Sequence, residues 1–241
     1  MRAGAVFSGQ SKVSALAISY KIAAEGVSLG TSVREAWRCR HLVTAFAWRD
    51  IKVRYKQTVL GAAWAIIQPL TTMGALSLVF ARFAKLSSGG VPYPLFVLSG
   101  LVLWQFFANA VTRASRSLVD ERYMLTRVYL PRVLVPLAAV ASGAPDVLVA
   151  CAMLGILTFV YRVQPTAMLL SIPLLLLLTA VLAGAVGLVL AAINARYRDV
   201  GITIPLLMQL WFLLTPVAYP ADIVPGRWRL ILSLNPVARP R

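Results

Sequence analysis

Acidic residues, and charged residues in general, are scarce in this chain. Its 241 residues include 8 Asp and Glu against 24 Lys and Arg, and 13% are charged while 59% are hydrophobic. Soluble globular domains are about 45–50% apolar and roughly 25% charged, so this chain lacks the polar surface that a water-soluble core requires. Disordered chains have low hydrophobicity. The high hydrophobic content of this chain therefore excludes a disordered chain as well. The composition predicts a protein that folds in a lipid bilayer.

Residues of the common catalytic and metal sites are also scarce. Cys39 and Cys151, the two cysteines, are far apart in the sequence, and His41 is the single histidine. This excludes a disulfide framework, a Cys-rich metal site and the usual zinc and Ser-His-Asp arrangements. No Gly-Lys dipeptide occurs, so the loop that holds nucleotide phosphates in P-loop ATPases is absent. We expect a chain that is not an enzyme and binds no cofactor or metal of its own.

Long uncharged runs account for the hydrophobic excess. A membrane-spanning helix needs about 20 mostly apolar residues. Backbone groups in hydrocarbon must be paired locally, which favours helices, and the runs lack the alternating segments of an outer-membrane barrel. Pro136, Gly143, Pro145 and Pro173 predict bends in the third and fourth runs. We predict an all-α membrane protein with five transmembrane helices, at about 58–81, 94–113, 132–161, 166–193 and 201–219.

The basic residues are unevenly distributed between these predicted spans. Ten precede the first span, five lie between the second and third, and two lie between the fourth and fifth; the alternate loops hold three. Cytoplasmic loops carry the positive excess in membrane proteins, so we place the N-terminus in the cytoplasm. We interpret residues 1–33 as a cytoplasmic tail and 34–241 as one membrane domain. The net charge of +16 then marks orientation, and we expect no nucleic-acid partner.

Segment 37–56 is too charged to span a membrane but has a helical pattern. Trp48 and Tyr55 fall on one stripe, and Phe46 and Val53 on a second, so we predict an N-terminal interfacial amphipathic helix with one stripe on lipid and the other on protein. Its basic residues can anchor the helix to the lipid surface, or can also receive an anionic headgroup or diphosphate. These residues are Arg38, Arg49, Lys52, Arg54 and Lys56.

Asp146 is the one acidic residue inside a predicted span, and we expect it near the middle of the membrane. An intramembrane carboxylate is costly and is therefore a candidate functional group. It can instead be structural, hydrogen-bonded to a neighbouring helix or protonated. Both interpretations stay open: a structural role, or ion coupling and substrate contact.

Aromatic residues recur near the span ends and along the spans. Belts of aromatic residues at the membrane interfaces explain most such positions. Aromatic faces also pack well on the C–H faces of sugar rings, so a second interpretation is a path for glycans. The candidates for this path are Trp64, Trp104, Phe107, Trp211, Phe212 and Tyr219.

An ordered set of motifs extends over about four-fifths of the chain. The motifs are the run 49–61 leading to Trp64 and Gln68-Pro69, the run 98–101 with Trp104 and Phe107, the runs 128–132 and 194–200, then Pro216-Val217 and Asn235-Pro236. In their order and spacing they resemble one family, the membrane subunits of bacterial polysaccharide-exporting ABC transporters, which move O-antigen, capsule, teichoic acid or related lipid-linked glycans.

The resemblance implies a homodimer of six-helix subunits that forms a channel for lipid-linked polysaccharide in the bacterial cytoplasmic membrane. Two ATPase subunits, which hold ATP and Mg²⁺, would dock on the cytoplasmic side. It further implies an outer re-entrant gate at 221–238 and a sixth span after it, which this sequence does not contain.

The resemblance also implies that two inner loops contact the ATPases, although any cytoplasmic loop is rich in arginine. The coupling residues would be Asp120, Glu121, Arg122, Tyr123, Arg127 and Tyr129 in one loop and Arg196, Tyr197, Arg198 and Asp199 in the other.

Three alternatives remain at this point. One is a permease of the same superfamily that exports a drug or small lipid. Another is an ion-coupled secondary transporter built around Asp146. The third is a scaffold subunit that does not itself transport.

Overall fold

The computed structural model describes residues 39–56, 63–83, 91–127, 130–163 and 171–215, and every regular element within these ranges is a helix. The tail 1–33 and the gate segment 221–238 lie outside the described residues, as do Arg38, Tyr129 and Tyr219. The helices are α2 (Arg40–Lys56), α3 (Ala63–Ser77), the π-helical turn η1 (Leu78–Phe83), α4 (Tyr93–Asp120), α5 (Arg122–Arg127), α6 (Leu134–Ala141), α7 (Ala144–Val160), α8 (Ile172–Arg196) and α9 (Val200–Leu214).

Four of the helical segments are long and apolar enough to cross a membrane. They are Ala63–Ala81, Tyr93–Asp120, Leu134–Val160 and Ile172–Arg196, and each overlaps one of the first four predicted spans. The helix of the fifth predicted span is shorter within the described residues, at Val200–Leu214. The prediction of an all-α, multi-pass membrane protein is confirmed.

The third predicted span is broken into α6 and α7. The break falls at Ser142 and Gly143, just before Pro145, which lies in the first turn of α7. Proline has no amide hydrogen and its ring clashes with the preceding turn, so a helix ends or bends in front of it. The predicted bend is therefore confirmed here, whereas Pro173 lies in the first turn of α8 and starts that helix.

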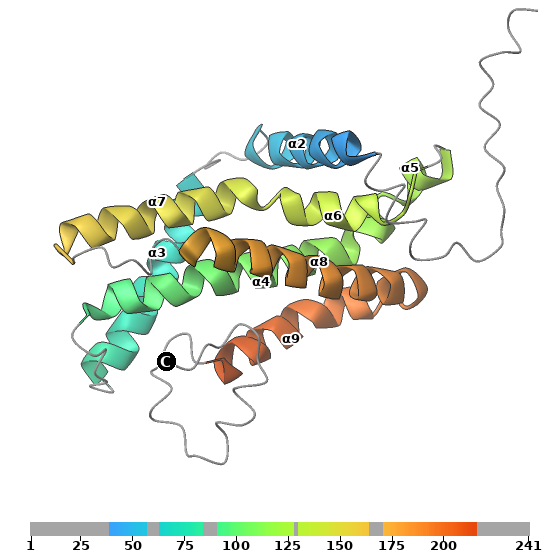
Figure 1. Cartoon of the computed structure of the whole chain (residues 1–241). Helices are drawn as coiled ribbons and strands as arrows, with labels where there is room; N and C mark the ends of the chain where they lie inside the picture. The colour runs from blue at the N-terminus through green and yellow to red at the C-terminus, as the bar shows by residue number, and fades with distance from the viewer. Residues whose placement is uncertain (1–38, 57–62, 84–90, 128–129, 164–170, 216–241) are drawn as a thin grey trace, which may run out of the picture.

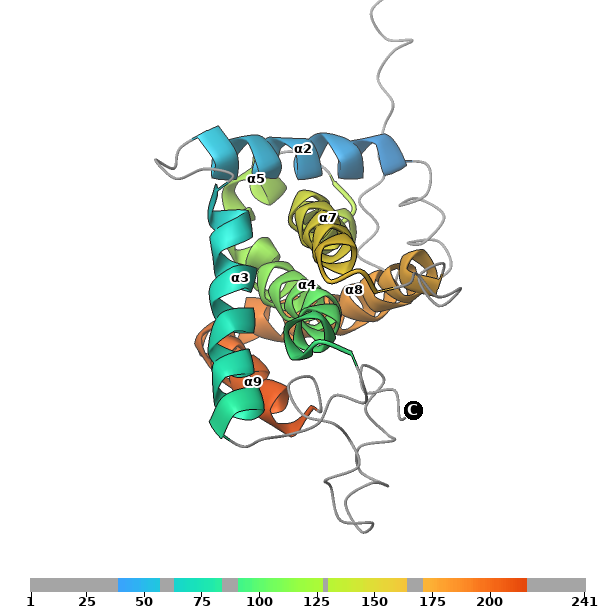
Figure 2. The ribbon, with the colours of Figure 1, turned by 90° about the vertical axis from the view of Figure 1, so that its left-hand side faces the viewer.

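Helix α4 forms the centre of the bundle and contacts α3, α6, α7, α8 and α9 (Figure 1). In the view of Figure 2, α4 and α7 are seen nearly end-on and α8 obliquely, while α3 is seen from the side, so α3 crosses the bundle steeply. Helix α2 lies across one side of the bundle and packs on α6. The spans are therefore not all parallel.

The core of the bundle depends on close contact between α4 and α8. A Cβ atom on Gly187 of α8 would lie 2.6 Å from Cβ of Ala114 on α4, so only glycine permits this separation. Small residues that let helix backbones approach closely are typical of membrane helix pairs. The largest fully buried side chain, Phe107, also belongs to α4.

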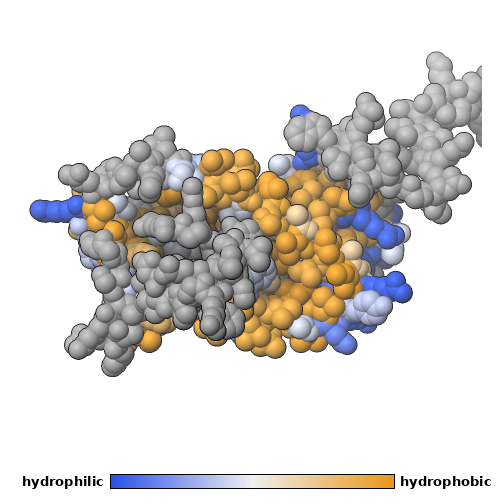
Figure 3. Space-filling model, turned by 60° about the horizontal axis from the view of Figure 1, so that its bottom comes forward, coloured by the Kyte–Doolittle hydropathy of each residue, from blue (hydrophilic) through white to orange (hydrophobic). Residues whose placement is uncertain are grey.

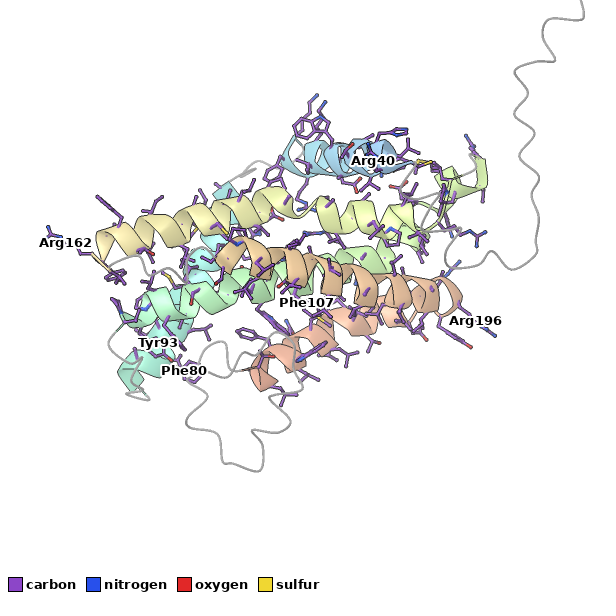
Figure 4. All side chains as sticks on the ribbon, in the orientation of Figure 1. Arg40, Phe80, Tyr93, Phe107, Arg162 and Arg196 are labelled. Carbon is purple, nitrogen blue, oxygen red and sulfur yellow. The ribbon has the colours of Figure 1, made fainter. Side chains whose placement is uncertain are left out.

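The outer surface of the bundle is apolar between two polar ends. Leu148, Phe159, Leu177 and Leu213, from three helices, are all more than half exposed. Figure 3 shows a broad hydrophobic band with hydrophilic residues gathered at the ends, and Arg162 and Arg196 mark opposite ends of the bundle in Figure 4. This distribution suits a protein whose middle is surrounded by lipid.

Candidate functional site

Charged residues from three distant segments meet where α2 crosses the bundle. The carboxylate of Asp146, in the first turn of α7, accepts hydrogen bonds from Arg54 and Tyr55 of α2 at 2.8 and 2.5 Å. Arg113 of α4 approaches the same carboxylate at 3.4 Å. We call Arg54, Tyr55, Arg113 and Asp146 the inner cluster. It joins the peripheral helix α2 to the centre of the bundle.

Asp146 therefore has hydrogen-bond or ion-pair partners on two neighbouring helices. It lies beside the end of α2, because α2 packs against the bundle at the level where α7 begins. The N-terminus of a helix carries a partial positive charge that also favours a carboxylate. Of the two interpretations left open, hydrogen bonding to neighbouring helices is the one that these contacts support.

Tyr55 serves the inner cluster as a hydrogen-bond donor. Burial, followed by the hydrogen bond to Asp146, raises the pKa of its hydroxyl to about 12. The ordinary pKa of tyrosine is about 10, so the hydroxyl stays protonated well above neutral pH. Its role is to hold the carboxylate rather than to exchange a proton.

A cavity of about 630 Å³, the inner cavity, opens beside the inner cluster between α2, α3, α4 and α7. Arg54, Tyr55, Arg113 and Asp146 line it, and the neutral polar residues Gln68, Gln105 and Asn109 add amide groups. Its remaining lining is apolar or small: Trp64, Ala65, Pro69, Val102, Phe106, Gly143, Val147 and Ala150. Because Gln68 and Asn109 are exposed, the cavity is open to the outside of the bundle.

A second group of charges lies nearer the end of α4. Arg49 of α2 pairs with Asp50 at 2.9 Å and with Glu121, the residue between α4 and α5. These residues line an outer cavity of about 510 Å³ together with Arg116 and Asp120. We call Arg49, Asp50, Arg116, Asp120 and Glu121 the outer cluster. Through it, α2 is tied directly to the α4–α5 junction.

Helix α2 follows the two predicted stripes only in part. Val53 is 51% exposed although Phe46 of the same stripe is half-buried, and Trp48 is 58% exposed while Tyr55 faces the bundle. The reason is that ion pairs to the bundle, rather than apolar residues alone, fix how α2 is rotated. On the exposed face of α2, the Lys52 ammonium lies 5.5 Å from the centre of the Trp48 ring.

The predicted diphosphate residues are accordingly divided between two faces of α2. Arg49 and Arg54 pair with acidic residues of the protein. Lys52 and Lys56 are exposed on the outside of the helix. The interpretation of the whole set as one lipid-facing arc is corrected by these contacts.

The predicted glycan path is also corrected in part. Trp104 and Phe107 are 4% and 0% exposed, and they pack with Trp211 and Phe212 at ring-centre distances between 5.6 and 6.1 Å. These four rings form a cluster inside the subunit, because helices α4 and α9 face each other there. Trp64, by contrast, is 56% exposed and lines the inner cavity.

The described residues predicted to contact an ATPase gather at one end of the bundle. Helix α5 and the turn between α8 and α9 lie at the same end, opposite Arg162 (Figures 1 and 4). No residue of α5 is buried, and Tyr123 is 69% exposed. Arg122 and Arg196 each lie over the ring of the next residue, Tyr123 and Tyr197. Arg127, Arg198 and Asp199 are exposed as well, whereas Asp120 and Glu121 belong to the outer cluster.

The sequence did not reveal Arg113 or Arg116 as partners inside the bundle, because both were placed in a loop after a span ending at residue 113. Helix α4 instead continues to Asp120. Arg116 donates to the carbonyl oxygen of Gly201 at 2.6 Å, and buried Asn194 bonds both Ser115 and Gly201 at 2.9 and 2.8 Å. The absence of Gly and Pro between residues 112 and 120 was the available signal that the helix continues.

Comparisons with known proteins connect this arrangement to transport. The model of the ABC-2 type transporter family matches residues 41–240. The O-antigen export system permease protein RfbA of Myxococcus xanthus is 29% identical over 207 residues, which cover 85% of this chain and 79% of the relative. RfbA of Klebsiella pneumoniae is 27% identical over 82% of this chain and 76% of its own length. The polysialic acid transport protein KpsM of Escherichia coli is 20% identical over 81% and 76%.

Proposed function

The chain belongs to the ABC-2 type transporter family, and we propose that it is the permease subunit of an exporter that moves lipid-linked polysaccharide across the bacterial cytoplasmic membrane. The observation that carries this proposal is its similarity, over more than four-fifths of its length, to proteins named as O-antigen export permeases. Its four membrane-length apolar helices agree with such a role.

In this proposal the energy comes from a separate ATPase subunit that holds ATP and Mg²⁺. The exposed helix α5 and the α8–α9 turn, at one end of the bundle, form the surface that receives this partner. A second copy of the chain completes the channel.

The outer cluster gives the partner's movement a route into the bundle. Displacement of α5 pulls on Glu121, whose ion pair with Arg49 moves α2. Arg54 and Tyr55 at the other end of α2 then act on Asp146 and α7. Ion pairs and packed helices of this kind carry coupling when they have two discrete arrangements.

The substrate would bind on the side of the bundle where the inner cavity opens. Trp64 offers an aromatic face for a sugar ring, and Gln68, Gln105 and Asn109 offer amide groups for its hydroxyls. Lys52 and Lys56, exposed on α2, would face the anionic lipid surface.

Copurification with the ATP-binding subunit of the same exporter tests the proposal. The tagged chain, coexpressed with that subunit, is expected to retain it and to alter its ATPase rate. Arg127→Ala and Tyr123→Ala, at the predicted contact end, should weaken both effects, while Arg162→Ala at the opposite end should not. Failure to copurify, or equal effects of the three variants, would contradict the coupling.

A further inference from the structure

The inner cavity holds more positive than negative charge. The guanidinium groups of Arg54 and Arg113 share the carboxylate of Asp146, which leaves one positive charge in excess among the residues lining the cavity. Nε of Arg113 is buried and has no hydrogen-bond partner within the described part of the chain. Excess charge in a membrane helix bundle is costly unless a counter-charge neutralises it.

Arg54 and Arg113 line both the inner and the outer cavity, so the excess lies where the two cavities adjoin. The outer cluster contains Asp50, Asp120 and Glu121 against Arg49 and Arg116, so it carries one negative charge in excess. The two clusters together are neutral. A ligand that enters the inner cavity therefore meets a short-range positive site and not a generally basic surface, because the neighbouring acids cancel the field at a distance.

Neutral hydrogen-bond donors extend the positive site along one helix. Gln105, Asn109 and Arg113 are spaced by four residues on α4, so they lie on one face of the helix, and all three line the cavity. Gln68 of α3 lines it as well. Guanidinium and amide donors that converge on one space are the chemistry that binds phosphate oxygens.

Gly143 leaves room for the guanidinium of Arg113. A Cβ atom at this position would collide with Nη2 of Arg113, so the bare backbone at the α6–α7 break is what allows that arginine its present place. This offers a way to displace the positive group without changing any charge.

The open side of the cavity points to a ligand with an apolar tail. Trp64 of α3, which is 56% exposed, borders the cavity, and the apolar side chains of Val102, Phe106 and Val147 continue its lining. A chain of lipid can therefore run past Trp64 while its headgroup occupies the cavity. Free phosphate would gain nothing from this apolar border.

We propose that the inner cavity is a binding site for the phosphate groups of an anionic lipid. Arg113 and Arg54 contact the phosphate oxygens, Gln105 and Asn109 donate further hydrogen bonds, and Asp146 holds the two guanidinium groups in place. The anion site then lies in the inner cavity, between Arg54 of α2 and one face of α4, and not on the outside of α2. Only the identification of that lipid with the diphosphate-linked carrier of a glycan rests on the proposed function.

Binding to the purified full-length chain in nanodiscs of zwitterionic lipid tests this site. The probes are a polyprenyl diphosphate without glycan, phosphatidylglycerol and inorganic diphosphate, each titrated separately. We expect Arg113→Gln to weaken binding of the polyprenyl diphosphate about tenfold, the effect of one charged hydrogen bond. Lys52→Gln, which removes an exposed charge of α2, is the matched control and should change little.

Gly143→Ala is a second test variant in case Arg113→Gln fails to fold. It keeps every charge and displaces mainly the end of a flexible side chain, while its Cβ also lies 3.2 Å from the carbonyl oxygen of Val140. We therefore expect a small loss of thermal stability with clearly weakened binding. Equal losses in Arg113→Gln and Lys52→Gln would overturn the proposal, because they would mean nonspecific attraction. Binding of inorganic diphosphate as tight as that of the lipid would overturn the lipid as ligand.

The assay contains neither glycan nor ATPase, so its failure differs from failure of the proposed function. A chain that binds the lipid diphosphate through Arg113 but exports no glycan keeps this inference and contradicts the function. If the chain exports glycan and its Arg113→Gln variant binds the lipid as tightly as the wild type, only this inference is contradicted.

Discussion

At the scale of single residues, Asp146 organises the contact between α2 and the bundle. One carboxylate receives two donors from α2 and lies within ion-pair distance of a third from α4. Hydrogen bonds to a charged group stabilise a protein more than hydrogen bonds between neutral groups. A buried polar group that loses its partner destabilises the protein further. Substitutions in the inner cluster are therefore expected to act on the attachment of α2 before they act on the helices themselves.

Tyr55→Phe should lower the stability of the protein by about 1–3 kcal/mol, because the carboxylate of Asp146 loses a donor. The raised pKa of Tyr55 gives this difference a pH dependence. The protonated hydroxyl contributes its full stability below the unfolded pKa of about 10, and this contribution is lost as the pH rises through the folded value of about 12. Thermal unfolding of both proteins between neutral and strongly alkaline pH measures the effect.

Tyr123→Phe is the control for this experiment, since it removes a hydroxyl from an exposed side chain. Its stability should follow that of the wild type at every pH. A Tyr55→Phe protein as stable as the wild type at neutral pH would show that the hydroxyl does not hold Asp146.

At the scale of the elements, helix α4 determines the architecture by packing against α3, α6, α7, α8 and α9. Its close contact with α8 depends on Gly187 and Ala114, and its last turns are fastened to α9 through Arg116 and Gly201. The polar bonds at one end and the small residues further along leave little freedom for α8 to move against α4. Movement during transport is then expected in α2 and α3, at the edge of the bundle.

Gly187→Ala should destabilise the protein by about 1–3 kcal/mol, the usual cost of inserting a methyl group into a close-packed contact. The added Cβ would lie 2.6 Å from that of Ala114, so α4 and α8 must separate. Gly155→Ala, on α7, is the control, because nothing lies within 4 Å of its added methyl group. Heat stability in detergent should fall for the first variant only, and equal stability of the two would contradict the packing.

Reversal of one charge in the outer cluster tests the link between α2 and α5. Arg49→Glu should reduce coupling of ATP hydrolysis to export, because it places like charges beside Asp50 and Glu121. The double variant Arg49→Glu/Glu121→Arg restores the attraction across the two helices and should recover much of the lost coupling. Export per ATP hydrolysed is the measurement, and a double variant no better than the single one would exclude the direct link.

The helices themselves could be predicted from the sequence because uncharged runs report directly on burial in lipid. The ends of the helices could not, since arginine normally marks a membrane border, and in α4 Arg113 and Arg116 pair with groups inside the protein instead. Asp146 was identifiable as an unusual acid. Its partners were not, because Arg54 is 92 residues away and pairs with it only through the packing of α2 on the bundle.

At the scale of the whole molecule, the two ends of the bundle differ in charge and exposed structure. One end carries α5 and Arg196 with its neighbours, while Arg162 stands at the other (Figure 4). This asymmetry agrees with the unequal loop charges in the sequence, which predict that the end with α5 faces the cytoplasm. The asymmetry also separates the surface proposed for the ATPase from the end that Arg162 marks.

Labelling of single cysteines in intact cells tests this orientation. After replacement of Cys39 and Cys151 by alanine, Arg162→Cys should react with a membrane-impermeant maleimide added outside. Arg196→Cys should react only after the membrane is opened. The reverse pattern would invert the topology and place the proposed ATPase surface on the wrong side.

The most direct test of the central claim is the amount of polysaccharide at the surface of cells that lack this protein. The account predicts that deletion abolishes surface polysaccharide, that lipid-linked polysaccharide accumulates on the cytoplasmic side, and that the wild-type gene restores export. Normal surface polysaccharide in the deletion strain, with loss only of resistance to a drug or of a small lipid, would contradict it.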